Sequence, residues 1–130
     1  MLAPPHLVRP FLSGEPDLLL VLALAKELTL SREAAARRYV QLRDPPAAVI
    51  FTENQVVRYW QAHPKFPRLA FANNQAAPNL PSMVRHDGLS KREKAAPEVW
   101  LHRSPFNSLT VQTLWQRDGF AMTLLAVTGS

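Results

Sequence analysis

Two adjacent prolines, Pro45 and Pro46, separate two parts of the chain that differ in hydrophobic periodicity. A proline lacks an amide donor and disfavours helical geometry in the residue before it, so a helix that reaches this pair must end there. Apolar residues recur at helical spacing before the pair and alternate as in β-strands after it. The sequence therefore predicts an α+β chain, with helix-turn-helix-like helices over residues 1–44 and a mainly antiparallel sheet of about five strands over residues 45–130.

The first part contains two predicted helices joined by a short turn. The earlier helix is predicted in the segment after Gly14, with Glu15, Pro16 and Asp17 near its start, where an early proline is tolerated and carboxylates favour the positive end of the helix dipole. Ser31 is the expected N-cap of the later helix, because its hydroxyl oxygen can accept a hydrogen bond from a free first-turn amide. In the later helix Ala35, Tyr39 and Leu42 recur at spacings of four and three residues and form an apolar stripe. We expect this stripe to pack and the helix to end at about Leu42.

The remaining surface of the later helix is polar and mostly basic. Its side chains could reach phosphates or base edges if the helix entered a DNA groove. The candidate nucleic-acid-binding residues are Arg32, Arg37, Arg38, Gln41 and Arg43. The net charge of +5 also suits an anionic partner, either nucleic acid or an acidic protein surface. The alternative is a solvated face on a packing helix, because helix pairs of this shape are common in proteins that bind no DNA.

Two β-hairpins are predicted after the proline pair. The first contains the strand-like runs of AAVIFTENQVVRYW, which meet at a Glu53-Asn54 turn. In the second run Tyr59 and Trp60 lie beside Arg58. We expect these rings to be core or interface anchors, while their position next to an arginine leaves base stacking open as an alternative.

The second hairpin is predicted around Asp118 and Gly119, which form a favoured two-residue turn. This turn places Trp115 opposite Met122 on the neighbouring strand. In that register one face of the hairpin holds Val111, Trp115, Met122, Leu124 and Ala126. The other face is mainly polar, so we expect a single core face.

Residues 61–97 lie between the hairpins and hold five prolines. Such a long irregular segment either covers the sheet or serves a function of its own. Near its end, Ser90 and Glu93 have the spacing of a capping box, which predicts a short polar helix before Pro97. The sequence EVWLHR that follows predicts another strand.

Signatures of catalysis, metal binding and membrane insertion are missing from the sequence. It has no cysteine, and no H-E-x-x-H arrangement places two imidazoles on one helix face. The four histidines are dispersed as His6, His63, His86 and His102. No P-loop, glycine-rich dinucleotide motif or G-x-S-x-G motif occurs. The longest apolar run, residues 18–25, is too short to cross a bilayer and lacks the flanks of a signal peptide. We therefore expect a cytoplasmic chain with no metal, no cofactor and no membrane association.

Four blocks of the sequence, in this order along the chain, resemble ImmA/IrrE metallopeptidases downstream of their catalytic segment. The blocks are MLAPPHLVRPFL, LALAKELTLSREAAARRYVQL, AAVIFTENQVVRYW and QTLWQRDGFAMTLL. In that family a zinc-binding H-E-x-x-H helix and a glutamate ligand precede a stretch similar to residues 1–5, and the peptidase cleaves a transcriptional repressor during stress. The zinc ligands and the catalytic glutamate have no counterpart in this sequence. The resemblance therefore implies no catalytic residue here and no peptide hydrolysis.

The resemblance implies a non-catalytic regulatory or recognition module. In that family the peptidase is followed by a helix-turn-helix-like unit and, in some members, by a GAF-like sensing domain. The expected partner is a transcriptional repressor protein or DNA, in stress-linked transcription regulation. Two alternatives stay open, namely a free-standing basic nucleic-acid-binding protein and, by the GAF analogy, a small-molecule sensor. A segment of a longer peptidase and a natural short protein would both fit this sequence.

Overall fold

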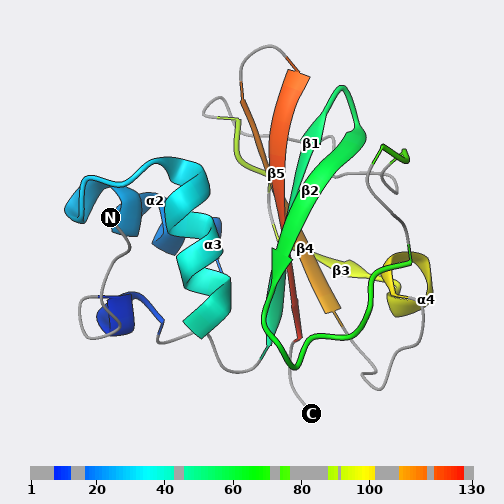
Figure 1. Ribbon diagram of the computed structural model, residues 1–130, viewed down its shortest axis with the longest axis horizontal. Helices are drawn as coiled ribbons and strands as arrows, with labels where there is room; N and C mark the ends of the chain where they lie inside the picture. Colours follow the sequence, from blue (N-terminus) through cyan, green and yellow to red (C-terminus); the bar gives the residue numbers. More distant parts are fainter. Residues whose placement is uncertain are drawn as a thin grey trace.

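A pair of helices followed by a five-stranded sheet makes up the computed structural model of the chain (Figure 1). The structure describes residues 8–12, 17–42, 46–70, 74–76, 88–90, 92–101, 109–116 and 119–127. The helices are η1 (Arg9–Phe11), α2 (Leu18–Glu27), α3 (Arg32–Leu42) and α4 (Pro97–Trp100). The strands are β1 (Ala47–Glu53), β2 (Val56–Ala62), β3 (Glu93–Ala95), β4 (Leu109–Trp115) and β5 (Phe120–Val127). The predicted α+β fold, with the helices first, is confirmed.

The strands form one antiparallel sheet in the order β2-β1-β5-β4-β3. Both predicted hairpins are present, β1 with β2 and β4 with β5. Strand β5 joins the two hairpins because it pairs along its length with β1, from Ala47 opposite Ala126 to Glu53 opposite Phe120. Strands β1, β5 and β4 are therefore interior strands, which agrees with their apolar sequences and nearly continuous burial.

Both faces of the sheet are covered, and each face has its own apolar cluster. Helices α2 and α3 lie on one face (Figure 1). The opposite face packs against Phe66 and Leu69 of the segment 63–70 and against Trp100 of α4. The prediction of a single core face was therefore wrong. Alternate residues of a strand point to opposite faces, and β1 and β5 carry apolar side chains at positions of both kinds.

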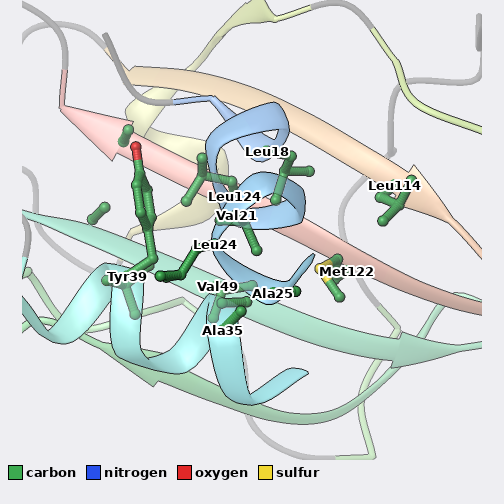
Figure 2. Close-up of a cluster of buried hydrophobic side chains, with 14 of the residues drawn as sticks. Leu18, Val21, Leu24, Ala25, Ala35, Tyr39, Val49, Leu114, Met122 and Leu124 are labelled. Carbon is green, nitrogen blue, oxygen red and sulfur yellow. The ribbon is translucent and has the colours of Figure 1, made fainter. Parts of the chain in front are cut away.

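Figure 2 shows the apolar cluster between the helix pair and the sheet. Leu18, Val21 and Leu24 of α2 and Tyr39 of α3 are fully buried in it. The sheet contributes Val49, Leu114, Met122 and Leu124. Full burial of a leucine or valine side chain contributes about 1.5–3 kcal/mol. This cluster is therefore the main force that holds the two helices on the sheet.

Each long helix begins at a side-chain cap. The predicted cap at Ser31 is confirmed, and Asp17, predicted only to lie near the start of the earlier helix, is the N-cap of α2. The Asp17 carboxylate accepts a hydrogen bond from the Leu19 amide at 2.9 Å. The Ser31 hydroxyl accepts one from the Ala34 amide at 3.1 Å. Each bond satisfies a first-turn amide that has no partner within its helix. Helix α3 ends at Leu42, as the following proline pair predicts.

The turn between α2 and α3 is a Schellman motif. The Leu30 amide donates to the Ala25 carbonyl at 2.9 Å, and Thr29 between the helices has a φ of 53°. Glycine is the usual residue at this left-handed position, because a Cβ there crowds the following carbonyl oxygen. The motif reverses the chain within a few residues, so α2 and α3 pack against each other as the sequence predicts.

The β4–β5 hairpin is confirmed, but its predicted register was wrong by one residue. Leu114, and not Trp115, lies opposite Met122. The connection is therefore one residue longer than the predicted Asp-Gly turn. A shift of one residue exchanges the two faces of a strand, so Val111 and Trp115 lie on the face opposite to Met122.

The β1–β2 hairpin is confirmed, with its turn one residue further along than predicted. Glu53 pairs with Val56, so the turn residues are Asn54 and Gln55, with φ values of 52° and 66°. Two successive positive φ values are typical of a type I′ turn, whose twist matches that of the flanking strands. Asparagine tolerates this conformation better than most residues, which explains its place at the turn.

Two predictions near the end of the central segment were wrong. Glu93–Ala95 is strand β3, paired with β4, and not part of a short polar helix. Ser90 caps no helix, because its hydroxyl oxygen accepts a hydrogen bond from the Thr113 amide at 2.9 Å. Pro97–Trp100 forms the short helix α4 instead of a strand. Pairing with the edge of β4 outweighed the local capping signal, and proline is favoured at the first position of a helix.

Candidate nucleic-acid interface

Helix α3 carries four of the five candidate nucleic-acid-binding residues: Arg32, Arg37, Arg38 and Gln41. The fifth candidate, Arg43, lies outside the described residues. Helix α3 packs against α2 and against strands β1 and β2 (Figure 1). Only the part of its surface that points away from these elements is open to a partner.

Three of the candidates share the open side of α3. The buried residues of the helix are Ala35, Ala36, Tyr39 and Val40. With about 100° between successive residues of a helix, Arg37, Arg38 and Gln41 fall on the opposite side. We call these three residues the α3 outer face. Arg37 is exposed, while Arg38 and Gln41 are partly exposed.

Arg32 does not belong to the α3 outer face. It precedes Tyr39 by about two helical turns and so falls on the same side of the helix as that buried ring. Its side chain is nevertheless exposed, because Arg32 is the first residue of α3. The structure therefore brings together three of the predicted residues and separates Arg32 from them.

A hydrogen bond links two members of the α3 outer face. Nη1 of Arg38 donates to Oε1 of Gln41 at 3.3 Å, as residues three apart on a helix can do. The bond orients the amide group of Gln41, whose nitrogen is a donor. The α3 outer face thus combines two guanidinium groups with an oriented amide, which are the groups that commonly bind phosphate oxygens and base edges.

A polar cluster that the sequence analysis missed lies beside this face, at the seam between α3 and β2. The Tyr59 phenol donates a hydrogen bond to Oε2 of Glu33 at 2.6 Å. Nη1 of Arg58 lies 3.4 Å from Oε1 of the same carboxylate. We call Glu33, Arg58 and Tyr59 the seam cluster. One carboxylate of α3 is therefore shared by a phenol and a guanidinium of β2.

Aromatic rings support the seam cluster from the sheet. The ring of Tyr59 stacks on that of Phe51, with centroids 4.6 Å apart. The guanidinium carbon of Arg58 lies 4.9 Å from the centroid of the Phe120 ring and 5.6 Å from that of Tyr59. A cation over an aromatic face is attracted by the ring quadrupole. Arg58 is thus positioned by two rings and a carboxylate together.

A β-bulge explains why strand periodicity could not reveal the seam cluster. Val57 and Tyr59 pair with consecutive residues of β1, so Arg58 between them is the extra residue of the bulge. In a regular strand Arg58 and Tyr59 would point to opposite faces. The bulge instead lets both side chains reach Glu33. The one signal in the sequence was the adjacency of an arginine and a tyrosine.

The seam cluster raises the pKa of Tyr59 to about 12. Burial of the phenol is the largest cause, followed by its hydrogen bond to Glu33 and by the negative charge of that carboxylate. The positive charges of Arg37 and Arg58 act in the opposite direction and lower this pKa. At neutral pH Tyr59 is therefore a neutral hydrogen-bond donor that holds the Glu33 carboxylate in place, and not a base or a nucleophile.

A second polar network joins the start of α2 to β4. The buried Gln112 side chain accepts a hydrogen bond from the Leu18 amide at 2.7 Å. Its nitrogen donates to Oδ1 of Asp17 at 3.2 Å and to the Ser90 carbonyl at 3.3 Å. Buried polar groups require such partners. These bonds fix the first turn of α2 on the sheet, so we assign this network a structural role.

Within the described ranges, no group of three or more histidine, cysteine, aspartate and glutamate side chains is placed to hold a metal ion. Of the four histidines only His63 is described, and its Nδ1 accepts a hydrogen bond from the Lys65 amide at 3.1 Å. His6, His86 and His102 lie outside the described residues. In the described part of the chain, no helix has the length and apolar character needed to span a membrane.

A comparison of the chain with protein-family models and with curated proteins gave no match. The relation to ImmA/IrrE proteins therefore stays a prediction from the four ordered sequence blocks.

Proposed function

We propose that this chain is a recognition module that binds the phosphate backbone of duplex DNA through the α3 outer face. The observation that carries the proposal is the position of Arg37, Arg38 and Gln41 on the side of α3 opposite to its buried residues. Two guanidinium groups on one helical surface can contact successive phosphates and release the counterions bound there. The net charge of +5 favours the same class of partner.

The packing of α3 supports this role for its outer face. Ala35 and Tyr39 fix the helix on α2 and the sheet, because both are fully buried in the cluster that these elements share. A helix held in this way presents its exposed side chains without a large loss of backbone entropy on binding. The backbone that carries the α3 outer face is therefore fixed before a partner with regularly spaced charges binds.

The proposal includes a regulatory setting related to the ImmA/IrrE proteins, without peptidase activity in this chain. Its support is the order of the four sequence blocks and the lack of counterparts for the family's zinc ligands and catalytic glutamate. In that setting a transcriptional repressor protein is the second candidate partner. The mixed charges of Glu33 on α3 and Arg58 on β2 favour it, because a protein surface can offer groups of both signs.

The test compares two double variants with equal loss of charge. Arg37→Ala/Arg38→Ala removes two cations from the α3 outer face. Lys65→Ala/Arg68→Ala removes two exposed cations from the segment that covers the opposite face of the sheet. Binding of a labelled duplex of about 20 base pairs is followed by fluorescence anisotropy at several salt concentrations. The salt slope is the slope of the logarithm of the binding constant against the logarithm of the salt concentration. Each lost phosphate contact reduces the size of this slope by about one unit.

We expect the α3 double variant to bind more weakly and to lose about two units of salt slope, while the control double variant keeps both affinity and slope. If both double variants lost DNA affinity equally, the net charge of the chain alone would determine binding, and the proposal would be wrong. Binding of a purified repressor that is lost in the α3 double variant, with no binding of DNA, would assign the face to the second candidate instead.

A further inference from the structure

We infer that the DNA-contacting surface continues from the α3 outer face across the seam to Arg58, and that Glu33 is an internal counter-ion which a DNA phosphate replaces. This inference rests on the proposed function and extends it to a residue of β2. It follows from the distances within the seam cluster, from the exposure of its ion pair and from the position of Arg37 on the helix.

Arg37 connects the two parts of the surface. It follows Glu33 by four residues, and side chains with this spacing are neighbours on a helix. The charges of Arg37 and Arg58 both act on the phenol of Tyr59, so both guanidinium groups are within electrostatic reach of the same point. A row of polar side chains therefore runs from Arg58 across Glu33 and along α3 to Arg37 and Gln41, which follow Glu33 at successive spacings of four residues.

The pair between Arg58 and Glu33 can be exchanged for an external partner. The side chains are 37% and 40% exposed, and their closest atoms are 3.4 Å apart. Exposed ion pairs of this kind contribute little stability, because water screens them. A DNA phosphate offers Arg58 two charged oxygens, whereas Oε2 of Glu33 already accepts the Tyr59 hydrogen bond, so a phosphate at the seam can take the place of Glu33 as the partner of Arg58.

The two partners of Glu33 differ in how firmly they hold it. Tyr59 donates a short hydrogen bond of 2.6 Å and is itself stacked on Phe51, so the carboxylate stays in place when Arg58 leaves it. Arg58 is kept near the seam by the ring of Phe120, 4.9 Å from its guanidinium carbon. The carboxylate therefore remains beside the surface as a negative charge that opposes phosphate binding.

The dimensions of the row favour a nucleic-acid backbone over an acidic protein surface. Glu33 and Gln41 are separated by about 12 Å along the helix axis at 1.5 Å per residue. Phosphates of one DNA strand follow each other at about 3.4 Å along the duplex axis, so a few successive phosphates cover this length. An acidic protein surface would have to present several carboxylates at matching positions.

The experiment measures duplex binding of Glu33→Gln, Arg58→Ala and their combination, with the same probe of about 20 base pairs. Glutamine keeps the oxygen that accepts the Tyr59 hydrogen bond and removes only the charge. Glu93→Gln, which removes one exposed carboxylate from β3 at the other edge of the sheet, is the matched control. Circular dichroism of each variant verifies that the fold is retained.

We expect Glu33→Gln to bind about fivefold more tightly, because it removes the carboxylate that competes with phosphate for Arg58. Adding Arg58→Ala should cancel this gain, and Glu93→Gln should bind like the unchanged chain. The inference is overturned if Glu33→Gln binds no better than Glu93→Gln, or if its gain persists without Arg58.

Failure of this inference can be told apart from failure of the proposed function. If Arg37→Ala/Arg38→Ala loses DNA binding while the seam variants bind like the unchanged chain, the proposed function stands and the inference is wrong. If neither the unchanged chain nor Glu33→Gln binds DNA, both are wrong.

Discussion

The phenol oxygen of Tyr59 lies 2.6 Å from Oε2 of Glu33 and joins an edge strand of the sheet to helix α3. This contact connects residues 26 positions apart in the chain. It holds a carboxylate between the α3 outer face and Arg58, and it raises the pKa of the phenol. The same hydrogen bond therefore bears on the stability of the fold and on the charge of the candidate interface.

The first prediction concerns the titration of Tyr59. Its pKa of about 12 should appear as a late rise in the ultraviolet absorbance of tyrosinate, and Tyr59→Phe, which keeps Tyr39, should lose the Tyr59 part of that rise. In Glu33→Gln we expect this pKa to fall only part of the way toward 10.0, because burial of the phenol is the largest cause of the shift and remains. A complete return to 10.0 in that variant would show that Glu33 alone sets the pKa.

The second prediction concerns stability at high pH. The pKa of Tyr59 is 10.0 in the unfolded chain and about 12 in the folded one, so the folded chain binds the proton more tightly. The resulting stabilisation is fully present below pH 10 and is lost as the pH rises toward 12. Urea unfolding across this range should show a steeper loss of stability for the unchanged chain than for Tyr59→Phe. Parallel curves would contradict it.

The third prediction tests the network around Gln112. Gln112→Leu replaces the side-chain amide with an apolar group of similar size. The Leu18 amide and the Ser90 carbonyl then lose the hydrogen bonds that they make with Gln112. We expect the free energy of unfolding to fall by about 2–4 kcal/mol, because buried unsatisfied groups retain their full desolvation cost. Gln116→Leu, at a partly exposed position just after β4, should change it by less than about 0.5 kcal/mol. Similar losses in the two variants would exclude a special role for Gln112.

The fourth prediction concerns two turns that touch. Gly119 has a φ of 81°, and a Cβ added to it would overlap Oδ1 of Asn54. Gly119→Ala should therefore destabilise the chain by about 2 kcal/mol or more, through backbone strain and the overlap together. Adding Asn54→Gly removes the overlap but not the strain. The double variant should thus lose less stability than the sum of the losses in the two single variants. If the losses were additive, backbone strain at residue 119 would account for the whole effect of Gly119→Ala.

The fifth prediction is a stabilising change. Thr29 occupies the left-handed position of the Schellman motif with a φ of 53°. Thr29→Gly should raise the free energy of unfolding by about 0.5–1 kcal/mol, since relief of the Cβ strain exceeds the greater entropy of glycine in the unfolded chain. Thr29→Ala keeps a Cβ and should give no such gain. Thermal unfolding of the two variants side by side distinguishes these outcomes.

Features that depend on neighbouring residues could be predicted from the sequence. Ser31 caps α3 and the proline pair that follows Leu42 ends it, because each effect acts within a few residues. Both hairpins follow from strand-like runs on either side of turn residues. The side of α3 that carries Arg37, Arg38 and Gln41 follows from helical periodicity alone.

The pairing of distant segments could not be predicted in this way. Glu93–Ala95 became a strand because an edge of β4 was available to it, although its local sequence favours a helix. The β4–β5 register depends on which residues the other strands and covering layers bury, and it differs by one residue from the register that the shortest turn predicts.

The candidate site shows the same division. Periodicity places Arg37 on the outer face of its helix and Arg32 on the side of Tyr39, but it cannot tell that Glu33 has partners on β2. That contact requires the hairpin to pack beside α3 and a bulge to direct both Arg58 and Tyr59 toward it. Local residue preferences act over one turn of a helix or one strand. The seam cluster instead arises from the packing of layers, where burial free energy summed over many side chains outweighs any local preference.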